Sequence, residues 1–324
     1  MSRSVVIGVD VGGTFTDILA LDEVTGEVKV AQVPSTKGDQ SAGFLEGILA
    51  ATDDLGMVST IIHGTTVATN ALLERKGAKT GIITTKGFRD ILEMRRRDRP
   101  TTWGLWGQFT PVVERQYRLE VAERTYADGT VAEVVDDAEV EAAAKALIAE
   151  GCEGVCLFFV NGYANVSNEA KAAAVLRRVW PNDYISVATE ILPEIREFER
   201  CSTAALNAYL QPIVANYLSR LEDRIADQKS KAEILIVQSN GGVMSVDTAK
   251  LLPVKTALSG PAAGVVAARQ IAKAAGFENV ITGDMGGTSF DVSLVADGQN
   301  MLTSQASIDF GMVIRTPMIE MKTI

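Results

Sequence analysis

An eight-residue pattern of acidic residues, glycines and hydroxyl side chains occurs twice in this chain. The segments 10–17 and 284–291 both fit D-x-G-G-T-x-x-D, and each stands between two apolar runs. Five fixed positions at roughly 6% usage each would coincide by chance at about one start in a million. The repeat therefore indicates two related strand–turn–strand units with the same chemistry.

The residue types in this pattern suit a phosphate group accompanied by a divalent cation. Two glycines at a hairpin turn are expected to adopt positive φ angles and to let the backbone approach a ligand. Successive backbone N–H groups then bind an anion, and the threonine hydroxyl adds a donor. The aspartates would repel phosphate unless Mg²⁺ and its water shell lay between them. Two such loops facing each other would clamp a triphosphate.

Two common nucleotide-binding patterns are absent from the sequence. There is no G-x-x-x-x-G-K-[ST] loop and no G-x-G-x-x-G fingerprint. The repeated pattern is therefore neither a Walker loop nor a Rossmann turn.

The elements that position these motifs are predicted to be mixed strands and helices. A short apolar run over 5–10 and alternating apolar and polar side chains over 15–21 and 27–33 predict an antiparallel meander of three strands. From residue 60 onward, apolar strands alternate with helices, which is typical of the α/β class. Further strands are predicted at 60–64, 80–85, 155–160, 234–238, 280–284 and 291–295, and helices at 40–52, 67–76, 140–150, 168–179, 194–225 and 262–275.

Three features bear on how the chain is divided. Pro212 is expected to interrupt the long helix, and residues 95–112 are predicted to form an irregular excursion that includes Trp103 and Trp106. The length of 324 residues suggests about two domains. We place the boundary where the long helix begins, which gives domains 1–195 and 196–324.

Composition excludes several classes of function. The net charge is −10, and no basic stripe is available to neutralise nucleic-acid phosphates. No apolar run of about 18 residues is present, so no membrane span is expected. The N-terminus predicts no signal peptide. Three cysteines are too few for a disulfide framework and indicate a cytoplasmic protein. Cys152 and Cys156 are expected to be core thiols.

The repeated motif resembles the two phosphate loops of the actin, hexokinase and heat-shock ATPase superfamily, in which a ribonuclease H-like domain is duplicated. The segment 259–265, followed by a helix and Asp284, is similar to the connecting helix of that superfamily. Within it, the chain resembles the hydantoinase A/5-oxoprolinase family, which includes acetone and acetophenone carboxylase subunits. The blocks that carry this resemblance are 8–17, 63–75, 81–90, 190–200, 207–210 and 238–242.

The resemblance implies an enzyme that uses ATP and Mg²⁺ to hydrolyse a cyclic amide such as a hydantoin or 5-oxoproline. Phosphorylation of the amide oxygen would open the carbonyl carbon to attack by water. Asp10 and Asp284 would hold Mg²⁺ through water, and one of them would orient the attacking group. Phosphate binding is assigned to Gly12, Gly13, Thr14, Thr16, Gly286, Gly287 and Thr288.

Other functions use the same residues. The phosphate loops would serve a subunit of an ATP-dependent ketone carboxylase equally well. A non-catalytic assembly subunit is a third alternative, although the intact aspartates argue against it. Family members are about twice this length, so the resemblance also implies a partial chain without the adenosine-binding segment. It implies a hetero-oligomer with a second subunit of the hydantoinase B type.

Several polar residues outside the repeat allow both a functional and a structural interpretation. His63, the only histidine, either contacts substrate as a catalytic residue or holds its loop. Thr65, Thr66, Thr69 and Asn70 either bind substrate or cap the following helix. Asn240 either faces substrate or forms an Asn-Gly turn.

The charged run 194–200 is expected to form a solvated helix face, with Arg196 and Glu199 as possible cleft residues.

Overall fold

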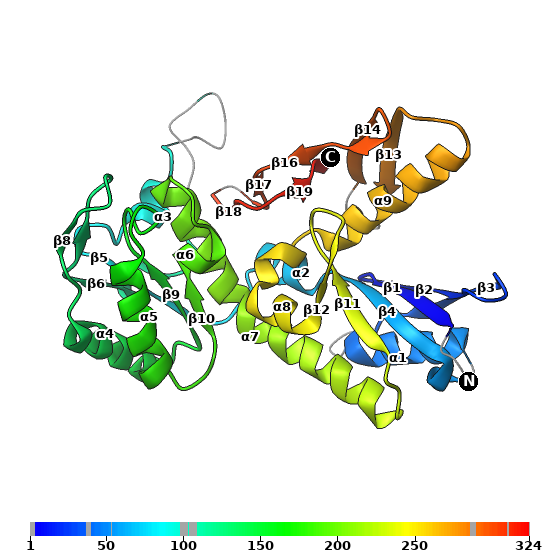
Figure 1. Ribbon diagram of the computed structural model, residues 1–324, viewed down its shortest axis with the longest axis horizontal. Coiled ribbons are helices and arrows are strands. Elements are labelled where there is room, and N and C mark those ends of the chain that lie inside the picture. Colours follow the sequence, from blue (N-terminus) through cyan, green and yellow to red (C-terminus); the bar gives the residue numbers. More distant parts are fainter. Residues whose placement is uncertain are drawn as a thin grey trace. The chain divides into compact units, whose positions relative to one another are not determined.

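The computed structural model describes residues 4–36, 40–52, 54–97, 103, 109–285, 290–309 and 311–323. The chain forms two compact units (Figure 1). Unit 1 comprises Met1–Asn70, Val214–Ser304 and Pro317–Ile324, and unit 2 comprises Ala71–Ile213 and Gln305–Thr316.

The predicted boundary between residues 195 and 196 lies inside unit 2, because the units follow contacts and not the order of the chain. Strand β11 (Glu233–Val237) returns from the second half of the sequence to pair with β4 (Val58–Thr65). The division at residue 195 therefore remains a prediction about sequence domains.

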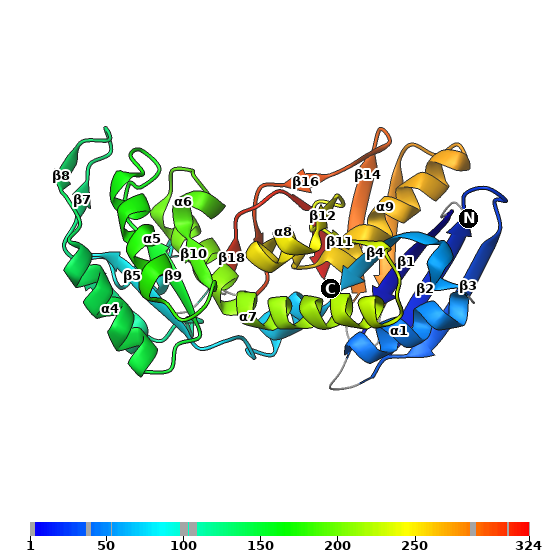
Figure 2. The same ribbon diagram turned by 60° about the horizontal axis from the view of Figure 1, so that its bottom comes forward.

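A six-stranded sheet is the centre of unit 1. The predicted meander is confirmed, since β1 (Val5–Val11), β2 (Phe15–Asp22) and β3 (Val28–Pro34) pair antiparallel. Strand β4 lies parallel to β1, and β11 lies parallel to β4. With β12 (Val243–Ser245), the order is β12-β11-β4-β1-β2-β3. Helix α1 (Gln40–Ala51) packs against the meander (Figure 2).

A second, smaller sheet in unit 1 carries the second copy of the motif. Its strands are β13 (Val280–Met285), β14 (Phe290–Ala296), β15 (Gln299–Asn300) and β20 (Met321–Thr323). Helix α9 (Ser259–Ala274) packs on one face through Ala262 and Val265. On the other face, the side chains of Ile281, Met285 and Leu294 are exposed.

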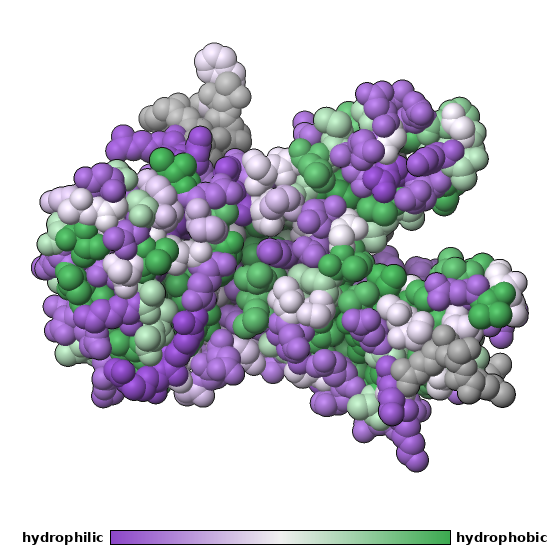
Figure 3. Space-filling model, viewed as in Figure 1, coloured by the Kyte–Doolittle hydropathy of each residue, from purple (hydrophilic) through white to green (hydrophobic). Residues whose placement is uncertain are grey.

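Figure 3 shows the hydropathy of one face of the molecule, with hydrophobic patches among hydrophilic ones near the labelled positions of α9 and β14.

Unit 2 is built on a four-stranded parallel sheet in the order β10-β9-β5-β6. Its strands are β5 (Thr80–Thr85), β6 (Arg118–Val121), β9 (Gly154–Phe158) and β10 (Ile185–Val187). Helices α4 (Asp137–Ala149) and α5 (Ser167–Val179) pack on the face that carries Ile83 and Leu157. The first part of α7 (Glu197–Asp227) packs on the face that carries Ile82 and Cys156. Cys152 and Cys156 are buried and free, as predicted, and Cys201 is buried and free as well.

Helix α7 is continuous through Pro212, so the interruption expected there is not found. In the turn before Pro212, the carbonyl of Tyr209 accepts a hydrogen bond from the Ala78 N–H at 2.9 Å. Proline removes the helical donor of the Ala208 carbonyl, and the contact to Tyr209 lies one residue further along the same turn. The helix begins at Glu197 and not at Glu194, because Arg196 has a φ of 102°.

Short elements complete the described chain. They are η1 (Leu55–Met57), α2 (Val67–Leu73), α3 (Ile91–Met94), η2 (Arg115–Tyr117), β7 (Arg124–Thr125), β8 (Val131–Glu133), α6 (Ala188–Ile191), α8 (Val246–Leu251), η3 (Pro253–Thr256), β16 (Leu302–Thr303), β17 (Ala306–Ser307), β18 (Val313–Ile314) and β19 (Met318–Ile319). Most of the excursion predicted at 95–112, including Trp106, lies outside the described residues. Trp103 is described and exposed.

Candidate functional site

The two copies of the motif occupy equivalent positions in two hairpins of unit 1. In the first hairpin Asp10 of β1 is the cross-strand partner of Asp17 of β2. In the second, Asp284 of β13 is the cross-strand partner of Asp291 of β14. The sequence repeat is therefore also a structural repeat. Gly286, Gly287 and Thr288 lie outside the described residues.

The turn of the first hairpin presents unpaired donors to solvent. Gly13 and Thr14 are exposed, and no described residue accepts a hydrogen bond from their N–H groups or from the Thr14 hydroxyl. A Cβ atom placed on Gly13 would meet nothing within 4 Å. This geometry leaves room for an anion beside the backbone.

The prediction that Gly12 and Gly13 adopt positive φ angles is wrong. Neither Gly12 nor Gly13 has a positive φ. Gly12 is needed for close approach within the hairpin, because a Cβ atom there would lie 3.0 Å from the Phe15 carbonyl oxygen. Its N–H donates to that same oxygen at 3.0 Å.

Thr16 does not join the exposed donors of the turn. It is fully buried, and its hydroxyl lies 3.0 Å from the hydroxyl of Ser35. Ser35 in turn donates to the Gly12 carbonyl at 2.8 Å. Side chains alternate along β2, so Thr16 points to the face opposite Asp17. Thr16 therefore supports the hairpin on the face opposite the aspartates. We withdraw its assignment as a phosphate-binding residue.

The carboxylate of Asp10 is not neutralised by any described residue. It makes no hydrogen bond or ion pair there, and neither does Asp284. Removal of water by the surrounding protein raises the pKa of Asp10 to about 6, and repulsion by Asp17 and Asp284 adds to the effect. These carboxylates therefore form a negative site that a cation would relieve.

The two aspartates fit the magnesium site inferred from the sequence. Mg²⁺ is usually held by one or two carboxylates together with waters and substrate phosphates. No group of three or more His, Cys, Asp or Glu side chains that could hold a metal by themselves occurs among the residues with described structure. The donor set therefore suits a cation shared with a phosphate more than a closed protein site.

His63 lies in the core of unit 1 and not at the site. It is fully buried on β4, where it is aligned with Val9, whereas the neighbouring Gly64 is aligned with Asp10. Because side chains alternate along strands, the imidazole points to the face opposite the Asp10 carboxylate. Its ring nitrogens lie 3.3 Å from the Val9 carbonyl oxygen and 2.9 Å from the Tyr217 hydroxyl.

Burial lowers the pKa of His63 to about 4. A neutral, enclosed histidine with two internal contacts is a structural residue. We therefore withdraw its catalytic assignment in favour of the loop-holding alternative.

The hydroxyl and amide groups of the segment 65–70 form hydrogen bonds within the segment and with other parts of unit 1. Thr65 is buried, and its hydroxyl accepts from the Val67 N–H at 3.2 Å. Thr66 donates to the Val11 carbonyl at 3.1 Å, and Asn70 donates to the Thr66 hydroxyl at 3.3 Å. Thr69 accepts from the Leu258 N–H at 2.9 Å. These contacts support the structural interpretation of the segment; its substrate role stays a prediction.

Asn240 forms the Asn-Gly turn that the sequence allowed as its structural role. Its Oδ1 atom accepts from the Gly242 N–H at 2.8 Å, and Gly241 has a φ of 82°. Asn240 remains exposed, so its substrate role stays a prediction.

Sequence reasoning missed the buried charges of unit 2. Glu199 and Arg200 are 3% and 1% exposed, so the end of the charged run is buried, whereas its residues at 194, 196 and 197 are exposed as predicted. Arg200 pairs with the buried Glu169 at 3.3 Å and donates to the Phe159 carbonyl at 3.0 Å. Arg96 contacts Glu199 through two hydrogen bonds. Because the partners are far apart in sequence, periodicity alone does not reveal these pairs.

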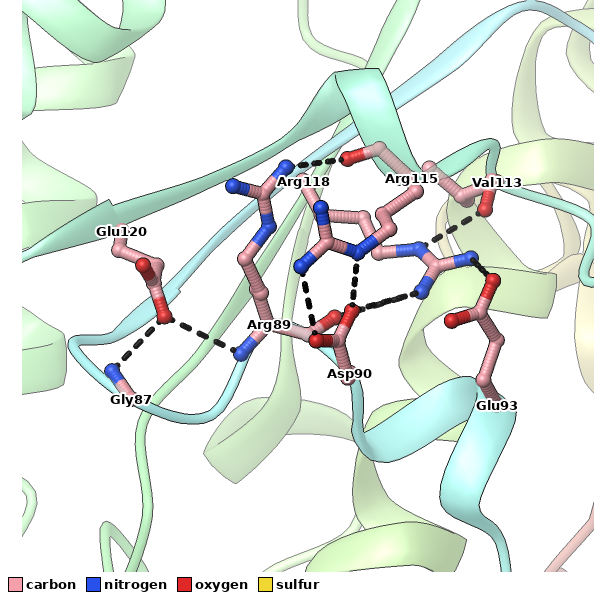
Figure 4. A network of polar contacts seen from close by, with 8 residues as sticks. All are labelled: Gly87, Arg89, Asp90, Glu93, Val113, Arg115, Arg118 and Glu120. Atoms are coloured by element: carbon pink, nitrogen blue, oxygen red, sulfur yellow. Dashed lines mark hydrogen bonds and ion pairs between the residues drawn. The ribbon is translucent and has the colours of Figure 1, made fainter.

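A second network in unit 2 joins the two ends of the excursion (Figure 4). Asp90 accepts two hydrogen bonds from Arg115, at 2.8 and 3.0 Å. The fully buried Arg118 donates to the Val113 carbonyl at 2.9 Å and lies 3.4 Å from Glu93. Since every one of these groups has a partner, we interpret the network as structural.

Comparison with protein families matches nearly the whole chain. The model described as "Hydantoinase/oxoprolinase N-terminal region" matches residues 6–180. The model described as "Hydantoinase/oxoprolinase" matches residues 200–324.

The curated relatives include a caprolactamase subunit and carboxylase subunits. The chain is 32% identical to caprolactamase subunit alpha of Pseudomonas jessenii over 98% of its own length and 47% of that protein. It is 31% identical to the acetophenone carboxylase gamma subunit of Aromatoleum aromaticum over 90% of its own length and 42% of that protein. The chain thus spans less than half the length of these relatives.

Two solved structures share the fold. The ATP-dependent caprolactamase of Pseudomonas jessenii is 32% identical, with a TM-score of 0.88 over 98% of this chain and 48% of that one. Acetone carboxylase in its nucleotide-free form is 25% identical, with a TM-score of 0.87 over 99% of this chain and 48% of that one. The fold is therefore the α/β fold of the actin and heat-shock ATPase type.

No helix in the described part of the chain is long and apolar enough to cross a membrane.

Proposed function

The chain belongs to the hydantoinase/oxoprolinase family, and from this we propose that it contributes the phosphate-binding half-site of an ATP-dependent enzyme that hydrolyses a cyclic amide. The observation that carries the proposal is the pair of hairpins in which Asp10–Asp17 and Asp284–Asp291 occupy the same register. The caprolactamase relative, which is named for a lactam and described as ATP-dependent, supports the substrate class.

The proposed chemistry needs positioning and charge neutralisation from this chain. MgATP, when bound, supplies the phosphoryl group that is transferred to the amide oxygen. The open turn at Gly13 and Thr14 binds phosphate oxygens through backbone N–H groups and a hydroxyl. Asp10 and Asp284 hold the cation through its water shell. Overall, ATP, the lactam and two waters become ADP, phosphate and the ring-opened amino acid.

The pKa of Asp10 suits this role at neutral pH. With a pKa of about 6, most Asp10 carboxylates are charged at pH 7 and can attract a cation. A bound cation would stabilise the charged form further. Asp284 supplies the matching carboxylate from the second hairpin.

The test is ATP hydrolysis with Mg²⁺ by the chain, alone and with hydantoin, 5-oxoproline or caprolactam. Because the chain supplies a half-site, we expect it to bind MgATP and to lose this binding in Asp284→Ala. Turnover stimulated by one cyclic amide is expected when the proposed second subunit is added. The Thr80→Val variant is the matched control, because Thr80 lies in unit 2 and its hydroxyl donates a hydrogen bond to the Ala78 carbonyl there. Stimulated turnover that persists in Asp284→Ala would overturn the assignment of the second hairpin. Absence of both turnover and ATP binding would overturn the proposal for this chain.

A ketone carboxylase subunit is the second candidate. The 31% identity to an acetophenone carboxylase subunit is almost as high as the identity to caprolactamase. The same assay therefore includes acetone and acetophenone with bicarbonate. ATP turnover that requires both ketone and bicarbonate would favour the carboxylase. A second subunit of the hydantoinase B type remains a proposed partner in either case.

A further inference from the structure

The carboxylate of Asp10 lies against two glycines from different elements. A Cβ atom placed on Gly64, near the end of β4, would lie 3.3 Å from Asp10 Oδ1 and 3.7 Å from the Cα of Gly260. A Cβ atom placed on Gly260, in the first turn of α9, would lie 3.4 Å from the same carboxylate oxygen. One side of the carboxylate is therefore bounded by the backbones of β4 and α9. Any shift of the α9 start would change the space available to it.

Two hydroxyl groups connect the start of α9 to the last residue of β4 and to α2. Thr69 Oγ1 accepts from the Leu258 N–H at 2.9 Å. Ser259 is fully buried, and its hydroxyl donates to the Thr65 carbonyl at 3.1 Å. Leu258 and Ser259 directly precede Gly260. These contacts thus determine where Gly260 lies beside Asp10.

Leu258 adopts a conformation that needs such support. It has φ 62° and ψ 24°, the left-handed region, and it precedes α9 without a side-chain capping bond. This conformation is unfavourable for a residue with a Cβ atom and persists only where surrounding contacts hold it. The Thr69 hydroxyl provides a hydrogen-bond acceptor for the Leu258 N–H in that conformation.

We propose that Thr69 is a positioning residue for Asp10, because its hydroxyl holds Leu258 and thereby sets Gly260 against the carboxylate. The catalytic importance of this arrangement rests on the proposed function, whereas the positioning itself does not. Thr69 acts through the backbone of α9 and does not need to touch the substrate. Its assignment thus differs from the substrate role expected from the sequence.

The test compares Thr69→Val, which removes the hydroxyl but keeps the shape, with Thr69→Ser, which keeps the hydroxyl. The first readout is the titration of the Asp10 carboxyl carbon by NMR in the chain without nucleotide or metal. We expect Thr69→Val to move its midpoint by about half a pH unit or more, since solvation and the distances to Asp17 and Asp284 would change. Thr69→Ser should restore the midpoint, and Thr80→Val should leave it unchanged. An unchanged midpoint in a folded Thr69→Val variant would overturn the proposal.

The second readout is the affinity for MgATP, measured by calorimetry. Loss of a supporting contact typically weakens metal binding by about tenfold to a hundredfold, and we expect Thr69→Val to fall in this range. If the unmodified chain does not bind MgATP, the proposed function fails while the NMR titration still tests the positioning.

A further variant covers the case in which Thr69→Val does not fold. Glycine adopts the left-handed conformation without strain, so Leu258→Gly should restore folding to Thr69→Val. The Asp10 titration is then measured in the folded double variant. We expect this double variant to show the normal midpoint, because glycine keeps the start of α9 in place without the Thr69 hydroxyl. A double variant that folds with a shifted midpoint would show that Thr69 does not act through Leu258 and would overturn the proposal.

Discussion

At the scale of single residues, the raised pKa of Asp10 makes folding stability depend on pH. Its pKa is about 6 in the folded chain and 3.8 as an isolated side chain, so the folded state binds the proton more tightly. A raised carboxyl pKa means that folding stability decreases as the pH rises from about 4 to about 6. We expect Asp10→Asn to lose this part of the pH dependence. Urea unfolding of both proteins at pH 4, 5, 6 and 7 measures it, and parallel curves would contradict the assignment.

The buried His63 predicts the opposite slope. Its pKa is lowered from 6.5 to about 4, so its contribution to stability is complete above pH 6.5 and is lost as the pH falls toward 4. The full loss would amount to about 3 kcal/mol. We expect His63→Gln to be less sensitive to acid over this range in urea unfolding.

The same variant also tests the withdrawn catalytic role of His63. The histidine points away from Asp10, so a folded His63→Gln should bind MgATP as the unmodified chain does. A folded variant that binds MgATP normally but loses turnover would restore the catalytic interpretation.

At the scale of elements, we expect substitutions of the two glycines in the first hairpin to affect different properties. Gly12 should matter for folding stability and Gly13 for ATP binding. Ala at position 12 would place its Cβ atom 3.0 Å from the Phe15 carbonyl oxygen, and we expect a loss of about 1–3 kcal/mol in unfolding free energy. Ala at position 13 meets nothing within 4 Å, so stability should change by less than about 0.5 kcal/mol.

Binding should respond differently to the Gly13→Ala substitution. If phosphate oxygens bind beside Gly13, the added methyl group should weaken ATP affinity by about tenfold to a hundredfold, the cost of losing one hydrogen bond to a charged group. Calorimetry and thermal unfolding of both variants check these expectations. Normal ATP affinity in Gly13→Ala would place the phosphates elsewhere.

The elements also show how far the sequence predicts the structure. Periodicity located both hairpins and most helices, because alternating and helical patterns depend on local burial. It could not show that Thr16 and His63 point away from Asp10, since this depends on strand register and on which face of the sheet each side chain occupies. Nor could it show the pairing of Glu169 with Arg200, which are 31 residues apart. Long-range pairs of this kind require the tertiary structure.

At the scale of the whole molecule, each unit has its own core, and the buried charges support only unit 2. Arg200→Met would leave Glu169, itself fully buried, without its charged partner. Burial already raises the pKa of Glu169, so the lost partner should cost about 3–5 kcal/mol. We expect faster hydrogen exchange in β9 and α5, with little change in β1 and β13. Adding Glu169→Gln should recover part of the loss, and equal destabilisation of both units would show that they unfold together.

Nucleotide binding should change hydrogen exchange in unit 1 and not in unit 2, because both copies of the motif belong to unit 1. We expect MgATP to slow hydrogen exchange in peptides covering residues 8–17 and 280–295, at both hairpins, since phosphate groups would accept hydrogen bonds from their backbone N–H groups. Asp10→Asn should reduce the protection at both hairpins if one cation and one phosphate chain are shared between them. Protection of the first hairpin alone would indicate that the hairpins do not bind the same nucleotide. Protection confined to unit 2 would contradict the assignment of the repeated motif to phosphate binding.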